Sequence, residues 1–228
     1  GNLTVNKNVT ASGGSSAAAT VTLTAVAGNI AVNNSSVSAA GGDASEGGGG
    51  NATVTLNAGA GIMVSNSSLL AQGGSGSGGG GDASVTLISA GNISMASTVS
   101  ATGGSGPPQG NASVTIIAGS GGGPGNITNG ATISADGGEG SITMTALQGF
   151  IHAGSGSLKA TASSALPVIS LTARDGIGTL VNPIRIDNTG DPDVNVQNLG
   201  TTMGDIAVSF FNNPMTGSCV AAGICIDG

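Results

Sequence analysis

The chain has 228 residues, a formal net charge of −7 and only four lysines and arginines, so it lacks the clustered cations that a nucleic-acid surface needs. No apolar run reaches the roughly 18 residues of a membrane-spanning helix, and no membrane span is predicted. Glycine supplies 44 residues, tryptophan and tyrosine are absent, and charged residues make up 7%, which excludes an ordinary globular composition.

Each repeated unit of the chain begins at a glycine and continues into three predicted strands. In the first unit the apolar pair Leu3 and Val5 predicts one strand, and Val9 with Ala11 predicts the next. The third strand, 20–23, alternates threonine with an aliphatic residue, the period-2 signature of a half-buried strand. Copies of this third strand follow at 53–56, 84–87, 113–116 and 141–144. Recurrence at intervals of about 20 to 50 residues indicates a stacked repeat architecture.

A glycine pair follows the second predicted strand in each of the first five units. The pairs are Gly13-Gly14, Gly41-Gly42, Gly73-Gly74, Gly103-Gly104 and Gly137-Gly138. The stretch that varies most in length comes directly after each pair, so we expect a tolerant loop there. We expect the paired glycines to supply positive φ angles at the bend that leads into the loop.

Three strands, three turns and one variable loop per unit predict one coil of a parallel β-helix. We therefore expect an all-β fold, a β-solenoid of about 7–8 coils over residues 1–210, with Gly-rich loop insertions in coils 1–4. Residues 211–228 are expected to form a C-terminal loop or partial cap. Cys219 and Cys225 in this segment would pair as a disulfide in an oxidising compartment, and two free thiols are the alternative.

Equivalent residues of successive coils should lie above one another in such a fold. Two inward aliphatic columns are predicted: Val21, Val54, Val85, Val114, Ile142 and Ile169, and Leu23, Leu56, Leu87, Ile116, Met144 and Leu171. Asparagines that follow the opening glycines are expected to hydrogen-bond up and down the stack: Asn2, Asn29, Asn92 and Asn126.

The Gly-Asn-Ile-x-Val openings and Val-Thr-Leu-x-Ala strands resemble the shaft repeats of filamentous-haemagglutinin-type exoproteins, the large secreted bacterial adhesins. Residues 175–179 and 182–186 resemble a sequence motif of those shafts, in which Gly-Ile-Gly is followed by Asn-Pro-aliphatic-x-aliphatic. The resemblance covers residues 1 to about 210. It implies a right-handed β-helix, secretion to an extracellular or cell-surface location, and work as an adhesin or surface fibre.

A catalytic site is not expected in this chain. The one histidine, His152, falls at an outward position, and no Ser/His/Asp set can be assembled around it. Polysaccharide-cleaving sites need clustered carboxylates, and the absence of tryptophan and tyrosine removes the usual sugar-stacking platforms. The four cations are scattered: Lys7, Lys159, Arg174 and Arg185. We therefore expect a non-enzymatic structural protein without a cofactor.

The densest group of side-chain oxygens is formed by Asp187, Asp191 and Asp193. Calcium takes about six to eight oxygen ligands, so this group is a candidate calcium site, although its spacing matches no established calcium motif. Five more acids lie in or beside the variable loops, where they would bridge calcium or simply solubilise the loops: Asp43, Glu46, Asp82, Asp136 and Glu139.

Nine asparagines stand in the Asn-x-Ser/Thr pattern of N-glycosylation acceptors. They are Asn2, Asn8, Asn33, Asn34, Asn51, Asn66, Asn92, Asn111 and Asn126. Two interpretations stay open: a sugar-coated rod, and a chain in which Asn, Ser and Thr are abundant only because they suit outward positions.

Outward hydroxyls of the third strand form two files along the predicted stack. The files are Thr20, Thr53, Ser84, Ser113 and Ser141, and Thr22, Thr55, Thr86, Thr115 and Thr143. Neighbours would lie about 4.8 Å apart along the stack and about 6.5–7 Å apart across a strand. Ice-binding solenoids use such arrays, so an ice-binding solenoid is the alternative function, although the next outward column is irregular.

The first unit begins without a cap, so we expect an open sheet edge there. Such an edge either continues in a longer chain or pairs end to end with another subunit, which would give filaments. Glycans and host or cell surfaces are the other partners that the adhesin resemblance implies.

Overall fold

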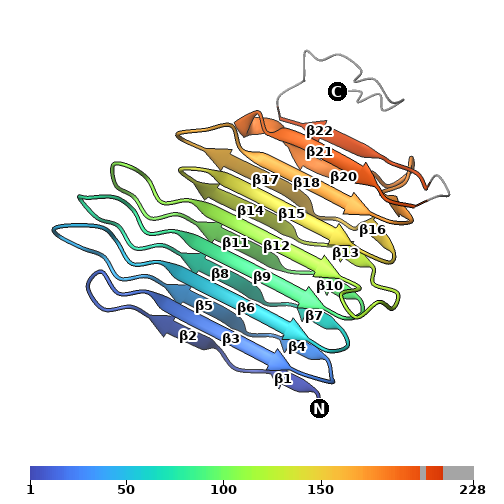
Figure 1. Ribbon diagram of the computed structural model, residues 1–228, viewed down its shortest axis with the longest axis horizontal. Helices are drawn as coiled ribbons and strands as arrows, with labels where there is room; N and C mark the ends of the chain where they lie inside the picture. The colour runs from blue at the N-terminus through green and yellow to red at the C-terminus, as the bar shows by residue number, and fades with distance from the viewer. Residues whose placement is uncertain (201–203, 213–228) are drawn as a thin grey trace.

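The computed structural model describes residues 1–200 and 204–212 of the chain. Three parallel sheets wind into a β-solenoid of about seven coils, and each coil contributes one strand to each sheet (Figure 1). Within the described residues the only helical element is the short 3-10 helix η1 (Asn188–Gly190). No helix in this part of the chain is long and apolar enough to cross a membrane. The predicted all-β solenoid with three strands per coil is confirmed.

The three sheets run along the full length of the stack. Sheet A contains β1 (Leu3–Val5), β4 (Ile30–Asn33), β7 (Ile62–Ser65), β10 (Ile93–Met95), β13 (Ile127–Asn129), β16 (Phe150–Ala153) and β19 (Gly176–Ile177). Sheet B contains β2 (Val9–Ser12), β5 (Ser36–Ala40), β8 (Ser68–Gln72), β11 (Thr98–Thr102), β14 (Thr132–Gly137), β17 (Ser157–Ala162), β20 (Ile184–Asp187) and β22 (Val208–Phe211). Sheet C contains β3 (Ala19–Ala25), β6 (Ala52–Ala58), β9 (Ala83–Ser89), β12 (Ala112–Ala118), β15 (Gly140–Ala146), β18 (Val168–Ala173) and β21 (Asp193–Asn198).

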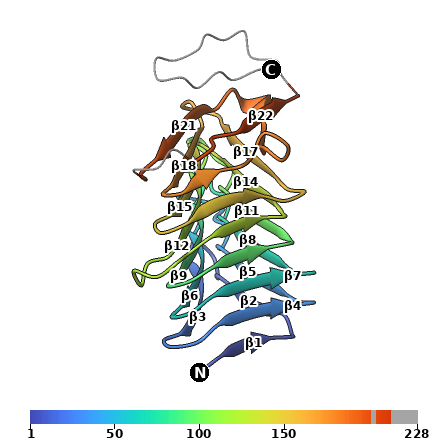
Figure 2. The same cartoon turned by 90° about the vertical axis from the view of Figure 1, so that its right-hand side faces the viewer.

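The strands of successive coils lie one above another (Figure 2). In sheet C they pair in a constant register, so like side chains stack along the rod. Val21 pairs with Val54, Val54 with Val85, and the column continues through Val114. The leucine column runs beside it from Leu23, which is half-buried in the first coil, to buried Leu171. Both predicted aliphatic columns are confirmed, and they form the sheet C side of the solenoid's core.

The same stacking continues in the C-terminal coils, where no glycine pair follows the second strand. Leu158 of β17 pairs with Ile186 of β20, and Ile186 pairs in turn with Phe210 of β22. The predicted boundary at residue 210 therefore falls inside β22. Residues 213–228, with Cys219 and Cys225, lie outside the described residues, and their pairing stays a prediction.

Candidate functional site

An asparagine ladder runs along the corner before sheet A. Each side-chain carbonyl accepts a hydrogen bond from a backbone N–H of the next coil, which is the predicted up-and-down bonding with the backbone as donor. The pairs are Asn29 N to Asn2 Oδ1 at 2.9 Å, Gly61 N to Asn29 Oδ1 at 2.8 Å, Asn126 N to Asn92 Oδ1 at 2.8 Å and Phe150 N to Asn126 Oδ1 at 2.9 Å.

A second ladder, which the sequence analysis missed, runs before sheet C. Its members directly precede β6, β9, β12 and β15, and this constant position is the signal that could have revealed it. The pairs are Asp82 N to Asn51 Oδ1 at 2.8 Å, Asn111 N to Asp82 Oδ1 at 2.8 Å and Glu139 N to Asn111 Oδ1 at 3.0 Å.

Replacing Asn92 by alanine should destabilise the fold by about 1 kcal/mol, because the Asn126 N–H loses its acceptor. Asn92→Asp keeps a side-chain oxygen at the same place, as Asp82 does naturally in the second ladder, and should retain most of the stability. Chemical denaturation followed by circular dichroism measures both variants. Equal losses in the two variants would contradict a role for the side-chain acceptor.

The ladders give a structural reason for most of the predicted glycosylation acceptors. Oδ1 accepts a hydrogen bond from the next coil in seven of them: Asn2, Asn8, Asn33, Asn51, Asn92, Asn111 and Asn126. The other two, Asn34 and Asn66, are exposed at turns with φ of 49° and 50°. Glycosylation itself stays a prediction.

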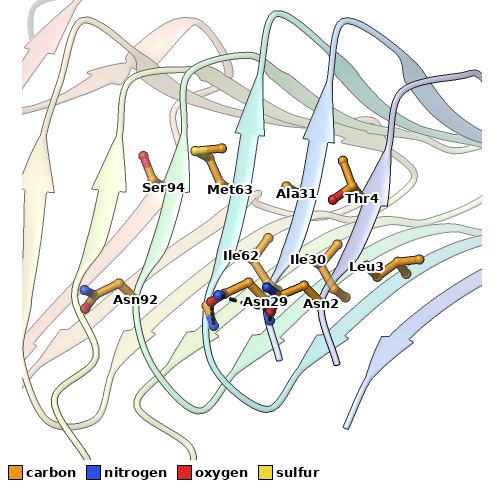
Figure 3. Close-up of a pocket in the computed structure, with 11 residues that line it drawn as sticks. Asn2, Leu3, Thr4, Asn29, Ile30, Ala31, Ile62, Met63, Asn92 and Ser94 are labelled. Carbon is orange, nitrogen blue, oxygen red and sulfur yellow. Dashed lines mark hydrogen bonds between the residues drawn. The ribbon is translucent and has the colours of Figure 1, made fainter. Parts of the chain in front are cut away.

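An open hollow of about 400 Å³ lies beside the asparagine ladder on the outer surface of sheet A (Figure 3). Ala31 stands between the larger side chains Thr4 and Met63 of adjacent strands, which leaves the surface low at this point. None of the lining residues carries an ionisable side chain. The hollow therefore offers shape and amide groups but no acid or base.

The variable loops pack into a flat extension of the rod, here called the glycine wing (residues 13–18, 41–51, 73–82 and 103–111). These loops project together beyond the strands that they join (Figure 1). Backbone hydrogen bonds join the two legs of each loop and also join successive loops. Examples are Gly50 N to Gly42 O, Gly74 N to Gly50 O, Gly81 N to Gly74 O and Gly104 N to Gly81 O, all at 2.8 Å.

The glycine pairs serve close packing, and the expectation that they adopt positive φ is wrong. A Cβ built on Gly42 would lie 1.5 Å from the Gly14 carbonyl oxygen, and one on Gly104 would lie 1.9 Å from that of Gly74. Positive φ occurs instead near the loop tips, at Gly47, Gly79 and Gly106. At these packed glycines the wing is an ordered backbone layer without room for a Cβ, whereas the sequence suggested loops that tolerate insertions.

The candidate calcium ligands take structural positions around η1. Asp187 precedes this 3-10 helix and accepts a hydrogen bond from the Thr189 N–H at 3.0 Å, while Asp191 follows it in the left-handed conformation. Lys159 Nζ lies 3.8 Å from Asp187 Oδ2, and Asp193 is exposed at the start of β21. Within residues 1–200 and 204–212, no three acidic, histidine or cysteine side chains gather closely enough to hold a metal ion. Calcium binding stays a prediction without geometric support.

Burial alone would raise the pKa of Asp187, but hydrogen bonds from Thr189 and Asn212 and the charge of Lys159 together lower this pKa below its ordinary value. The ionised carboxylate therefore adds stability above about pH 4, which is the pKa of an aspartate in the unfolded chain. This stability is lost as the pH falls through the lower pKa of the folded state.

The wild-type protein should be more stable than Asp187→Asn at neutral pH, and this difference in stability should disappear below about pH 4. Denaturation midpoints at several pH values measure this, and a pH-independent gap would contradict it.

The remaining ionisable side chains do not form a common cluster within the described part of the chain. His152 is exposed on sheet A and stacks on the Phe150 ring, with centroids 5.3 Å apart. Arg185 lies over the Phe211 ring at 4.8 Å, and Arg174 donates a hydrogen bond to the Gln148 side chain. Asp43 accepts a hydrogen bond from the Ser75 N–H at 2.7 Å within the wing.

The two predicted hydroxyl files lie in register on the outer surface of sheet C. Thr22 pairs with Thr55, Thr55 with Thr86, and the file continues through Thr115 and Thr143. The neighbouring file runs in the same way from Thr20 to Ser141. All of these side chains are exposed or half-buried.

No family model matches the chain, and neither a curated protein sequence nor a solved structure matches it.

Proposed function

We propose that this chain is a rigid, non-enzymatic shaft segment of an extracellular surface fibre or adhesin. The observation that carries the proposal is the continuous apolar core, to which stacked side chains of all three sheets contribute along the rod. Each coil of such a solenoid contacts only its neighbours, so the structure extends in one direction and acts as a spacer. The resemblance to filamentous-haemagglutinin-type shafts supports the same role and a location outside the cell.

The two side-chain ladders and the glycine wing add support for stiffness. Both ladders join a coil to the next at a corner, beyond the ends of the paired strands. The wing adds a further set of backbone hydrogen bonds along one edge. A shaft with these connections would hold an attached adhesive element, directed at glycans or a cell surface, at a fixed distance. Continuation in a longer chain or end-to-end association would lengthen it.

Electron microscopy of the purified protein over a range of concentrations tests the proposal. About seven coils at about 4.8 Å each give a rod about 34 Å long. We expect straight rods of uniform width, with end-to-end association giving lengths in multiples of that value. Bent or collapsed particles would contradict the shaft, and short particles at every concentration would contradict the end-to-end association. Release of reducing sugar from polysaccharides by the protein would contradict the non-enzymatic role.

A further inference from the structure

We propose that the outer surface of sheet C binds ice. This surface, the hydroxyl face, consists of the outward side chains of β3, β6, β9, β12, β15 and β18. Its ligand would be the ordered water at the surface of an ice crystal. The inference does not depend on the shaft role, because it concerns one face of the rod and not its length or its ends.

The hydroxyl face is regular in two dimensions. Its six strands lie side by side and nearly parallel in Figure 1, and their residues pair in a constant register. Hydroxyls therefore repeat at about 4.8 Å along the stack and about 6.5–7 Å across each strand. Threonine occupies the central file in five successive coils, and its branched Cβ restricts χ1, which limits the positions of its methyl and hydroxyl groups. Water molecules at an ice surface also repeat in two dimensions, so a protein face that binds them needs side chains at regular intervals.

The hydroxyls of this face are free to bond outward. On sheet B, neighbouring side chains bond to each other: Ser38 to Thr10 at 3.4 Å, Ser134 to Ser100 at 2.9 Å and Thr161 to Asp136 at 2.6 Å. On the hydroxyl face, no outward Ser or Thr makes a side-chain hydrogen bond within the described part of the chain. The side chains concerned are Thr20, Thr22, Thr24, Thr53, Thr55, Ser84, Thr86, Ser113, Thr115, Ser141, Thr143, Thr145, Ser170 and Thr172.

The six strands of the hydroxyl face carry no charged side chain. Ionised groups hold water in shells that do not match a crystal, and none occurs in β3, β6, β9, β12, β15 or β18. The first charged residue on sheet C is Asp193 in β21. Sheet B carries Asp136, Lys159, Arg185 and Asp187. On sheet A, adjacent outward positions hold side chains as different as Thr4, Ala31 and Met63. The other two faces therefore fit ice less well.

The irregular third column is compatible with this ligand. Ile88 and Ile117 are half-buried and stand where Thr24 and Asn57 stand in the first two coils. Covering these apolar side chains removes them from liquid water, which is favourable. The mixture of methyl and hydroxyl groups thus differs from a polysaccharide-binding face, which commonly uses aromatic rings.

Thermal hysteresis and inhibition of ice recrystallisation test the proposal with the intact chain and ice as the probe. We expect both activities in the wild type and their loss to the buffer level in Thr115→Lys. Thr102→Lys is the matched control, since Thr102 is an outward, half-buried threonine of the neighbouring sheet B. It should keep wild-type activity. Thr86→Lys, one coil earlier on the hydroxyl face, repeats the test in case Thr115→Lys fails to fold by circular dichroism.

Three results would overturn the proposal. The first is a folded wild-type protein with neither thermal hysteresis nor recrystallisation inhibition. The second is an equal loss of activity in the hydroxyl-face variants and in Thr102→Lys. The third is retention on crystalline cellulose or chitin without any effect on ice, which would assign the face to a polysaccharide.

Discussion

Leu69→Ala should lower the free energy of unfolding by about 2–5 kcal/mol, the cost of removing a large side chain from a packed core. Leu69 in β8 is fully buried and stacks between Val37 and Val99 of the adjacent coils. Neighbouring strands are held in register by backbone hydrogen bonds, so they cannot close in readily on the space left behind. The effect should therefore be large for a single substitution.

Leu70 provides a matched control, because it is the next residue of the same strand and points outward. Its side chain is 38% exposed, so Leu70→Ala should cost no more than about 1 kcal/mol. Urea denaturation followed by circular dichroism is suitable, since the chain has no tryptophan to report by fluorescence. A larger loss for Leu70→Ala than for Leu69→Ala would mean that β8 is turned over relative to this structure.

The strands and their stacking could be predicted because side chains specify both. Alternation in β9 and β12 shows which residues face inward, and a slip by one residue would turn every valine outward. Similar residues recur at the same place in each coil, so the register between coils follows as well. The asparagine ladder was predictable for the same reason: the side chain itself makes the contact.

The glycine wing could not be predicted in this way. Glycines have no side chain to show a period, and the bonds that order the wing join backbone atoms of residues from different coils. The variation in loop length between coils suggested loops that tolerate insertions, whereas each loop packs directly on the next. The acidic segment at Asp187 shows the same limit, because closeness in sequence did not bring Asp191 and Asp193 to a common site within the described residues.

Gly49→Ala should open the wing locally. A Cβ on Gly49 would lie 1.9 Å from the Gly74 carbonyl oxygen, and the obstacle is backbone that cannot turn aside. Overpacking of this kind costs about 1–3 kcal/mol, which corresponds to amide exchange about 5 to 150 times faster in the affected loops. Hydrogen exchange at the Gly50, Gly74 and Gly81 amides measures this local opening, because all three amides donate hydrogen bonds within or between the loops of the wing.

Gly48→Ala is the control that separates close packing from glycine content. The adjacent Gly48 has only the Gly79 carbonyl oxygen near an added Cβ, at 3.9 Å, and its φ is not in the left-handed region. Alanine there restricts the unfolded chain and should leave stability unchanged or raise it by about 0.4–1 kcal/mol. If both variants exchange like the wild type, the loops do not pack as a layer, and the wing cannot stiffen the shaft. Faster exchange in Gly49→Ala alone would show that glycine is needed here because a Cβ does not fit, and not because the backbone must be flexible.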